Sequence, residues 1–326
     1  MTRRAAAADP RIHHHPLAVR TVFVAPRRAA RPADLGLDAV HADAPCPFCP
    51  GHESLTPPAV LRAPAIEEAP WHARIIPNRY PVVEPLATED GDVRPAHGVH
   101  EVVIESAAHV RSILAVPRDR WREVWELIRR RLEMLAADER LVWATVFKNS
   151  GEHAGASLEH LHSQLVALDF VPPVMAAELA AAAAMTDPFG DLVRRAEATG
   201  CVVATAADLV ALVPPAPRQP FETWIVPRVS EPHFHATSAA RVAALADLTQ
   251  DVVARLAQAA PRADFNWWLH QAPFTRPAVE SPQHWHWHLE ILPRLAHFAG
   301  FELGTGCHIT TAAPEESARL LTDGPA

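Results

Sequence analysis

The residues with the clearest chemical potential lie between Phe147 and Phe170, where two histidines and a glutamine are spaced two apart: His160, His162 and Gln164. Residues two apart on an extended strand point the same way, so we expect these side chains to project into one site. A loop of small residues and amides precedes them, formed by Asn149, Ser150, Gly151, Gly155 and Ser157. Small residues let backbone amides approach a phosphate closely. Imidazole beside such a loop favours chemistry at phosphorus.

His162 is the candidate nucleophile if His160 serves a metal. A neutral imidazole can attack an α-phosphorus and form a covalent nucleotidyl-histidine, which divides one transfer into two displacements. Gln164 can donate a hydrogen bond without shuttling a proton, which suits a leaving group that needs little protonation, such as a sugar phosphate. The alternative for a bare His-x-His is a structural pair on a half-buried strand, and the loop upstream argues against it.

Cys46 and Cys49 form the sequence CPFC, a spacing that presents two thiolates to one tetrahedral zinc ion. Two further ligands are needed, and histidine is the usual complement. The alternatives are two cysteines without a metal or a redox pair. The redox alternative is the weaker one, because CPFC does not open a helix after a thioredoxin-like strand.

A second group of histidines follows near the C-terminus, where HWHWHLE places His284, His286, His288 and Glu290 on one face of a predicted strand. Two of these histidines and His270 on the neighbouring strand could bind a metal. A solvated edge strand is one alternative. Another is a second histidine triad with His286 as nucleophile, but no glycine-rich loop precedes it, so we favour a structural role.

The elements that must position these residues follow one layout twice. The first copy predicts a strand, an amphipathic helix and two strands, at 99–106, 118–140, 141–149 and 159–168. The second copy repeats this order at 221–229, 237–260, 263–273 and 284–294. Between them an alanine-rich helix starts near Met175, and Asp187, Pro188 and Gly190 form a break. The pattern predicts a duplicated α+β unit built on antiparallel sheet.

Composition excludes several classes of protein. With 326 residues, 49% of them hydrophobic, the chain can form one large domain or two medium ones with a sizeable core. A net charge of −8 argues against a general nucleic-acid binder, which normally has a basic face. No apolar run approaches the roughly 18 residues that a membrane helix needs. The N-terminus lacks the apolar segment of a signal peptide, so we expect a cytoplasmic protein.

Eight segments resemble the galactose-1-phosphate uridylyltransferase family, the transferase branch of the histidine-triad superfamily. They occur in family order between about residues 18 and 318: APRRAARP (25–32), CPFCPGHE (46–53), IPNRYP (76–81), VIESAAH (103–109), FKNSGEHAGASLEHLHSQ (147–164), PFETWIVP (220–227), LHQAPF (269–274) and HWHLEILPR (286–294). The resemblance implies two histidine-triad-like domains, which we place at 18–190 and 195–318, with antiparallel sheets flanked by helices.

The resemblance also implies two metal sites. Zinc would be bound by Cys46, Cys49, His109 and His160, with His162 left as the residue that accepts the uridylyl group. A second, structural metal, iron or zinc, would be held by Glu178, His270, His286 and His288.

Substrate contacts follow from the same resemblance. Positions that hold the phosphates match Asn149, Gly155, Ser157 and Gln164. Asn78 lies where the family contacts the base or ribose, and Arg28 and Arg31 align with arginines near the sugar phosphate. Glu302 matches an acid that binds hexose hydroxyls and can come from the partner subunit, which implies a homodimer.

The implied reaction is ping-pong transfer of UMP from UDP-glucose, through His162, to galactose-1-phosphate. Two features depart from this pattern. Leu161 stands where the family has proline between the two histidines, and IPNRYP and His162-Ser163-Gln164 also resemble adenylyl-transferring relatives. The alternatives are therefore an ADP-sugar phosphorylase of the same family, or an inactive, zinc-stabilised nucleotide-binding protein.

Overall fold

The computed structural model describes residues 9–14, 21–25, 45–66, 68–85, 94–274 and 284–323. Arg28 and Arg31, two of the predicted substrate contacts, lie outside the described residues. No helix in the described ranges is long and apolar enough to cross a membrane.

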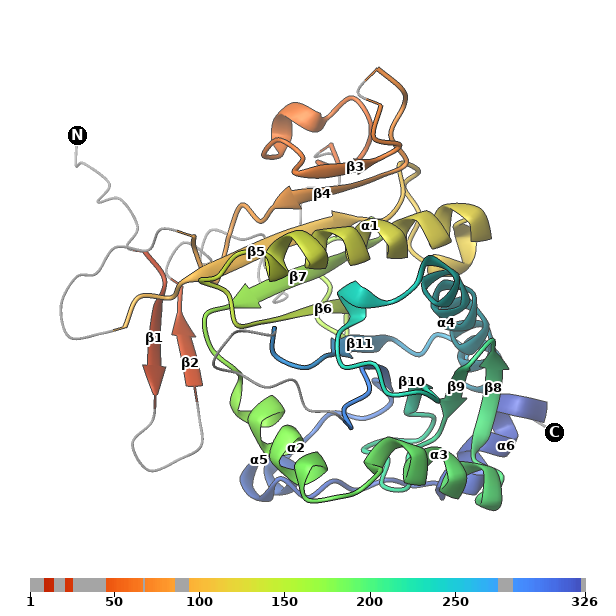
Figure 1. Ribbon diagram of the computed structural model, residues 1–326. Helices are drawn as coiled ribbons and strands as arrows, with labels where there is room; N and C mark the ends of the chain where they lie inside the picture. Colours follow the sequence, from red (N-terminus) through yellow and green to blue (C-terminus); the bar gives the residue numbers. More distant parts are fainter. Residues whose placement is uncertain are drawn as a thin grey trace.

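A ten-stranded sheet forms the centre of the molecule, in the order β3-β4-β5-β7-β6-β11-β12-β10-β9-β8 (Figure 1). Its first five strands in the chain are β3 (Leu61–Ala63), β4 (Ala73–Pro77), β5 (Gly98–Ile104), β6 (Trp143–Ser150) and β7 (His162–Leu168). The other five are β8 (Val202–Ala206), β9 (Leu209–Leu212), β10 (Thr223–Pro227), β11 (Phe265–His270) and β12 (His288–Pro293). Neighbouring strands pair antiparallel throughout. A separate hairpin pairs β1 (Arg11–His14) with β2 (Thr21–Val24).

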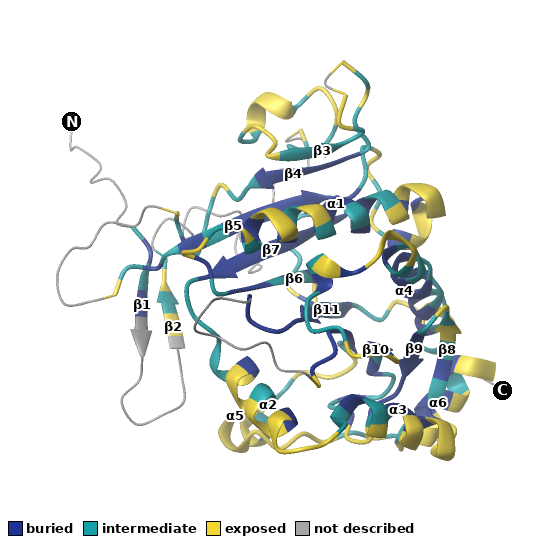
Figure 2. Ribbon diagram, in the orientation of Figure 1, coloured by how far each residue is buried: buried dark blue, intermediate teal, exposed yellow. Residues whose placement is uncertain are grey.

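Two long helices, α1 (Arg118–Ala136) and α4 (Ala239–Ala259), pack together over one face of this sheet (Figure 1). The predicted apolar stripe of α1 is buried as expected, and it comprises Trp121, Trp125, Ile128, Leu132 and Leu135. Trp121 and Trp125 contact Trp267 of β11, with ring centroids 5.9 and 5.8 Å apart. The inner side of both helices is buried, and their outer side is exposed (Figure 2).

The remaining elements are shorter helices and turns. They are α2 (Pro173–Ala183), α3 (Pro188–Thr199), α5 (Gly300–Thr305), α6 (Pro314–Asp323) and the short turns η2 (Glu53–Leu55), η3 (Ile113–Ala115) and η4 (Phe234–Ala236). α6 packs against α4 and β8, and α3 contacts β9.

The sheet order confirms the predicted α+β class and its duplicated layout. Each half runs as three strands, a long helix and two strands, and the halves join where β6 pairs with β11. Both halves thus contribute to one continuous sheet, and the boundaries 18–190 and 195–318 stay a prediction.

The predicted break after the alanine-rich helix is present between α2 and α3, and the further helix that begins at Pro188 was not predicted. Asp187 is the N-cap of α3, with its Oδ1 accepting a hydrogen bond from Gly190 N at 3.1 Å, and Pro188 occupies the first turn. The histidine strand also begins later than predicted, at His162, so that His160 precedes it.

We expect Trp121→Ala to lower the free energy of unfolding by about 3–5 kcal/mol, because it leaves a large cavity between the halves. Trp121 is fully buried, and its Nε1 donates to Thr249 Oγ1 of α4 at 2.9 Å. Urea denaturation followed by circular dichroism measures the change. The half-exposed Met134 of the same helix provides the control, and Met134→Ala should stay within about 0.5 kcal/mol of the parent. Equal losses in both variants would contradict the packing described.

Candidate functional site

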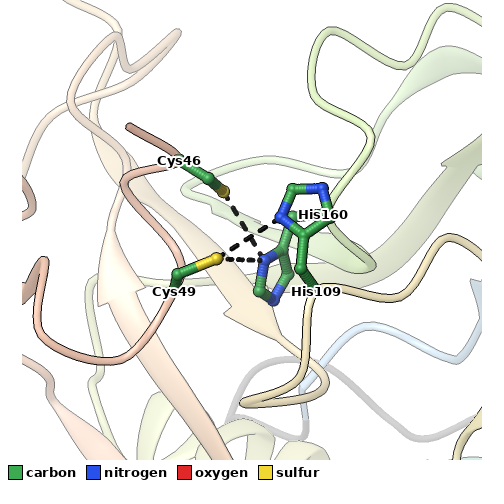
Figure 3. Close-up of side chains that lie close together, drawn as sticks. All are labelled: Cys46, Cys49, His109 and His160. Carbon is green, nitrogen blue, oxygen red and sulfur yellow. Dashed lines mark hydrogen bonds between the residues drawn. The ribbon is translucent and has the colours of Figure 1, made fainter. Parts of the chain in front are cut away.

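Four side chains from three segments meet beside the start of β7 (Figure 3). Cys46 and Cys49 precede β3, His109 follows β5, and His160 comes just before β7. Their ligand atoms lie within 4.8 Å of one another. His160 Nδ1 is 3.5 Å from Cys46 Sγ and 3.6 Å from Cys49 Sγ, and His109 Nδ1 is 3.3 Å from Cys49 Sγ.

These separations fit four donors around one tetrahedral metal ion. Bonds of about 2.3 Å to sulfur and 2.0 Å to nitrogen place two such donors roughly 3.5 Å apart. His160 Nε2 donates to Ser106 O at 2.8 Å, which fixes the ring and presents Nδ1 to the group. Burial lowers the pKa of His160, so the ring is neutral as a ligand must be. The group can therefore hold a metal ion.

The ionisation of the cysteines depends on such an ion. Burial raises the pKa of the Cys49 thiol, and the neighbouring Cys46 raises it further. A thiol in these surroundings keeps its proton at neutral pH unless a cation displaces it. The metal-loaded state and the folded geometry of this turn therefore stabilise one another.

His162, the first residue of β7, is held in one tautomer. Its Nδ1 donates to His160 O at 2.8 Å, so the neutral ring carries its proton there and Nε2 is the basic nitrogen. Phe48, between the two cysteines, packs edge-on against both histidine rings, with centroids 5.9 Å from His160 and 5.5 Å from His162. The cysteine turn thus contributes to the position of the candidate nucleophile.

Gln164 is oriented by a residue that the sequence analysis missed, His100 of β5. His100 Nδ1 accepts a hydrogen bond from Val82 N at 3.1 Å, which leaves the proton on Nε2. That Nε2 donates to Gln164 Oε1 at 3.0 Å. The oxygen of Gln164 is therefore engaged, and the amide NH₂ is the group that can donate to a ligand. The only signal for His100 was a polar residue on a strand otherwise rich in valine.

Asn78 joins the same group from the end of β4. Its Nδ2 lies 3.0 Å from His100 Nε2, and its Oδ1 accepts a hydrogen bond from Tyr80 N at 2.8 Å. The structure therefore places Asn78, predicted to contact the base or ribose, and Gln164, predicted to contact the phosphates, beside the same histidine, His100.

The small-residue loop after β6 has the conformation that glycine permits. Gly151 and Gly155 have φ values of +91° and +82°, in the left-handed region. A Cβ on Gly151 would lie 1.8 Å from a carboxylate oxygen of Asp264. The amide of Gly155 donates to Glu152 O at 2.8 Å, so this N–H serves the loop itself.

Residues of the second half anchor this loop, and the sequence analysis missed them. Asn266 of β11 donates from Nδ2 to Asn149 Oδ1 and to Ala154 O, both at 2.9 Å. Asp264 Oδ2 accepts from His153 N at 2.7 Å. The position of the loop therefore depends on the pairing of β6 with β11.

A cavity of about 400 Å³ lies on the same face of the sheet, between β6, β11 and the start of α2. Its lining includes Phe147, Asn149, Met175, Trp268 and His270. Phe147 is directly opposite Gln164 in the sheet register, so the cavity adjoins the candidate site. Its volume is in the range of small-molecule sites.

A second group of ligand atoms brings together Glu178, His270 and His288. His270 Nδ1 lies 2.8 Å from Glu178 Oε2. Glu290 Oε1 lies 3.6 Å from both His270 Nε2 and His288 Nε2, and this last nitrogen has no hydrogen-bond partner among the described residues. Three of the four predicted ligands therefore meet.

His286 is not part of this group within the described chain. Its Nδ1 donates to Pro227 O at 2.7 Å, and its ring stacks on Phe189. Glu290 occupies the space beside the other two histidines instead. Burial alone would raise the pKa of Glu290, but His288, His270 and Arg218 outweigh it and lower the pKa to about 2. This carboxylate is therefore ionised at any physiological pH.

His162 and His288 are structural counterparts in the two halves. Each is the first residue of the corresponding strand, β7 or β12. Each ring also donates from Nδ1 to the carbonyl of the histidine two residues earlier, at 2.8 Å to His160 and 3.1 Å to His286. One side of the sheet thus presents two similar imidazoles in different electrostatic surroundings.

Glu302 lies in α5 and is not part of either group of ligand atoms. Its Oε2 accepts a hydrogen bond from Ala299 N at 2.9 Å and caps the helix. Backbone hydrogen bonds at this helix start lower the pKa of Glu302.

Two family models match the chain. One is described as "Galactose-1-phosphate uridyl transferase, N-terminal domain" and matches residues 6–172. The other is a "Domain of unknown function (DUF4921)" and matches residues 122–323.

Several characterised proteins are similar over most of their length. An ADP-glucose phosphorylase of Arabidopsis thaliana is 30% identical over 328 residues, covering 97% of this chain and 93% of the relative. A galactose-1-phosphate uridylyltransferase of Thermotoga maritima is 26% identical, covering 76% of this chain and 82% of the relative. The structure of an ADP-glucose phosphorylase from Arabidopsis thaliana with bound ADP-glucose matches with a TM-score of 0.77 at 30% identity, covering 98% of this chain and 100% of that chain.

We expect Cys46→Ser to lower the metal content of the purified protein by one equivalent, because a tetrahedral site loses a thiolate. Elemental analysis by mass spectrometry measures this. Cys307→Ser is the control, since Cys307 is exposed and stands outside the group. A Cys46→Ser protein with the parental metal content would contradict a metal site at these four residues.

Proposed function

Because the chain belongs to the galactose-1-phosphate uridylyltransferase family, we propose that it transfers a nucleotidyl group through a covalent bond to His162. The observation that carries this proposal is the ring's tautomer, which makes Nε2 the basic nitrogen beside a neutral amide donor and a glycine loop. The preferred donor in this proposal is an ADP-sugar, and the acceptor is inorganic phosphate.

In the first displacement, His162 Nε2 forms a bond to the α-phosphorus of ADP-glucose. The bond from this phosphorus to the bridging oxygen breaks, and glucose-1-phosphate leaves with the electron pair. Gln164 donates its NH₂ to the departing oxygen, because its own oxygen is engaged by His100. The leaving phosphate has a second pKa of about 6, so it needs no proton from a general acid.

In the second displacement, an oxygen of inorganic phosphate attacks the adenylyl phosphorus. The bond from phosphorus to His162 breaks, the imidazole is restored, and ADP leaves. Covalent catalysis of this kind divides one difficult transfer into two steps at the same nitrogen.

Support for an adenylyl group comes from the ADP-glucose phosphorylase relative, whose similarity extends over 97% of this chain. Uridylyl transfer from UDP-glucose to galactose-1-phosphate is the second candidate. The matched family description and the Thermotoga maritima relative favour it. Both candidates use the same nucleophile and differ in the base and the acceptor.

The substrate contacts stay as predicted from the resemblance. In this proposal Asn149 and Ser157 hold the phosphates on the loop that Gly155 shapes, Asn78 contacts the base or ribose, and Arg28 and Arg31 meet the sugar phosphate. Glu302, at the start of α5, would bind the hexose of a partner subunit in a homodimer.

We assign zinc to Cys46, Cys49, His109 and His160, because two thiolates and two imidazoles are the donors that structural zinc prefers. All four positions are filled by protein, so the ion would hold the turn and the start of β7. A second structural metal, zinc or iron, would be bound by Glu178, His270 and His288, with Glu290 in place of His286. The buried His288 Nε2 supports this assignment, because it has no hydrogen-bond partner in the described chain.

We expect His162→Ala to abolish the covalent adduct and to lower transfer by at least about 10³-fold while the metal content stays at the parental value. Intact-mass spectrometry after incubation with the nucleotide sugar detects an acid-labile adduct in the parent. Gln164→Ala is a useful companion, since it should form the same adduct more slowly. An adduct of equal yield in His162→Ala would show that another residue is the nucleophile.

We expect ADP-glucose to label the protein faster than UDP-glucose, and phosphate to discharge the adenylyl group. Single-turnover labelling with each donor, followed by addition of phosphate or galactose-1-phosphate, makes the comparison. Faster uridylyl labelling with discharge by galactose-1-phosphate would favour the second candidate. Tight binding without any label exchange between the nucleotide sugar and glucose-1-phosphate would identify a binding protein without transferase activity.

A further inference from the structure

A buried ion pair lies directly beneath the candidate nucleophile, on the face of the sheet opposite its imidazole. Lys148 of β6 and Glu105, which follows β5, have side chains only 1% and 0% exposed. Lys148 Nζ hydrogen-bonds to Glu105 Oε2, and it also donates to His162 O at 2.8 Å. The other carboxylate oxygen of Glu105 accepts from Ser163 Oγ. The ion pair therefore bonds to two consecutive residues of β7, to the backbone of His162 and to the side chain of Ser163.

Stability alone does not explain this pair. Its surroundings are apolar, with the ring of Trp267 5.5 Å from Lys148 Nζ, and burial lowers the pKa of Lys148. Removing two charges from water costs several kcal/mol per ion, and well-packed neutral replacements of buried pairs are often as stable as the pair. The charges instead fix an orientation. The charge-assisted hydrogen bond from Lys148 sets the orientation of the His162 carbonyl.

The residues before this carbonyl are tied as well. Leu161 N donates to Val110 O at 2.8 Å, and Leu161 O accepts from Glu105 N at 3.3 Å. Glu105 thus makes two hydrogen bonds to this segment. Its backbone bonds to Leu161, just before β7, and its side chain bonds to Ser163. Leucine at position 161 leaves the backbone more flexible than proline would. The contacts of Glu105 therefore fix the path of the backbone into His162.

We propose that Lys148 and Glu105 are positioning residues for covalent transfer, which fix the His162 backbone so that Nε2 lies in line with the attacked phosphorus. This inference rests on the proposed role of His162 as nucleophile. Neither residue touches the substrate, because both project from the opposite face of the sheet, toward α1 and α4. A displacement of about 1 Å at a reacting atom can slow a reaction roughly 100-fold.

The test is the double variant Lys148→Met/Glu105→Gln, which removes both charges and keeps an acceptor for Ser163. Adduct formation is followed by rapid quench and intact mass over a range of ADP-glucose and UDP-glucose concentrations. We expect the maximal rate of adduct formation to fall about 100-fold. The half-saturating concentration should stay within about twofold and the metal content should not change, because the residues act on geometry and not on binding.

A matched control comes from a second buried pair on the same face. Glu101 of β5 is bound by Arg131 of α1, with side chains 3% and 13% exposed, and it makes no contact with β7 through its carboxylate in the described structure. Arg131→Met/Glu101→Gln should therefore change stability by a similar amount and leave the maximal rate within about threefold of the parent.

The outcomes separate this inference from the proposed function. A parent protein that forms no adduct with either donor would overturn both. A parent that reacts, together with a Lys148→Met/Glu105→Gln protein of equal maximal rate, would overturn the positioning role alone, as would equal losses in the control. If the double variant does not fold, Ser163→Ala provides the decision, since it removes one of the two links to Glu105 and should lower the maximal rate several-fold without changing half-saturation.

Discussion

The antiparallel pairing of β6 with β11 is the constraint on which the rest of the structure depends. It joins the two halves into one sheet and sets their register, with Asn149 opposite Asn266 and Phe147 opposite Trp268. Directly opposed residues share a face, so this register places the candidate site residues of both halves on one side of the sheet. The same pairing brings Asn266 to the glycine loop. A shift of one residue would send these side chains of one half into the helix-covered face.

Burying this many polar groups on a sheet is costly unless each finds a partner. The structure meets this requirement by linking strands through side chains. His100 connects Gln164 to Val82, in the segment after β4, and Ser106 accepts from the ring of His160. Such bonds also fix tautomers and amide orientations, so the arrangement that keeps the sheet stable also leaves each group with a defined donor or acceptor. The burial of these polar side chains therefore also preorganises the site.

Sequence alone predicts the parts of this structure that follow a local rule. Period-two alternation locates β5, β6, β7, β11 and β12, because the two faces of each strand differ in polarity, and the apolar stripe locates α1. Short strands such as β3 and β9, of three and four residues, contain too few positions for a period to be visible. The start of α3 was read as a break because an N-cap aspartate followed by proline has the composition of a turn. His100, Asn266 and Lys148 could not be found locally, since their partners lie 64, 117 and 43 residues away.

The two equivalent histidines lie on one framework in different electrostatic surroundings. His162 and His288 begin corresponding strands and share the same Nδ1 hydrogen bond, yet a neutral amide, Gln164, follows the first and an ionised carboxylate, Glu290, follows the second. Glu290 Oε2 pairs with Arg218, and its Oε1 lies 3.6 Å from His288 Nε2, where it favours a cation over a phosphate. The amide beside His162 imposes no such barrier on an anionic substrate. Under the proposed function, the identity of one side chain two residues along the strand would favour an anionic substrate in the first half and a cation in the second.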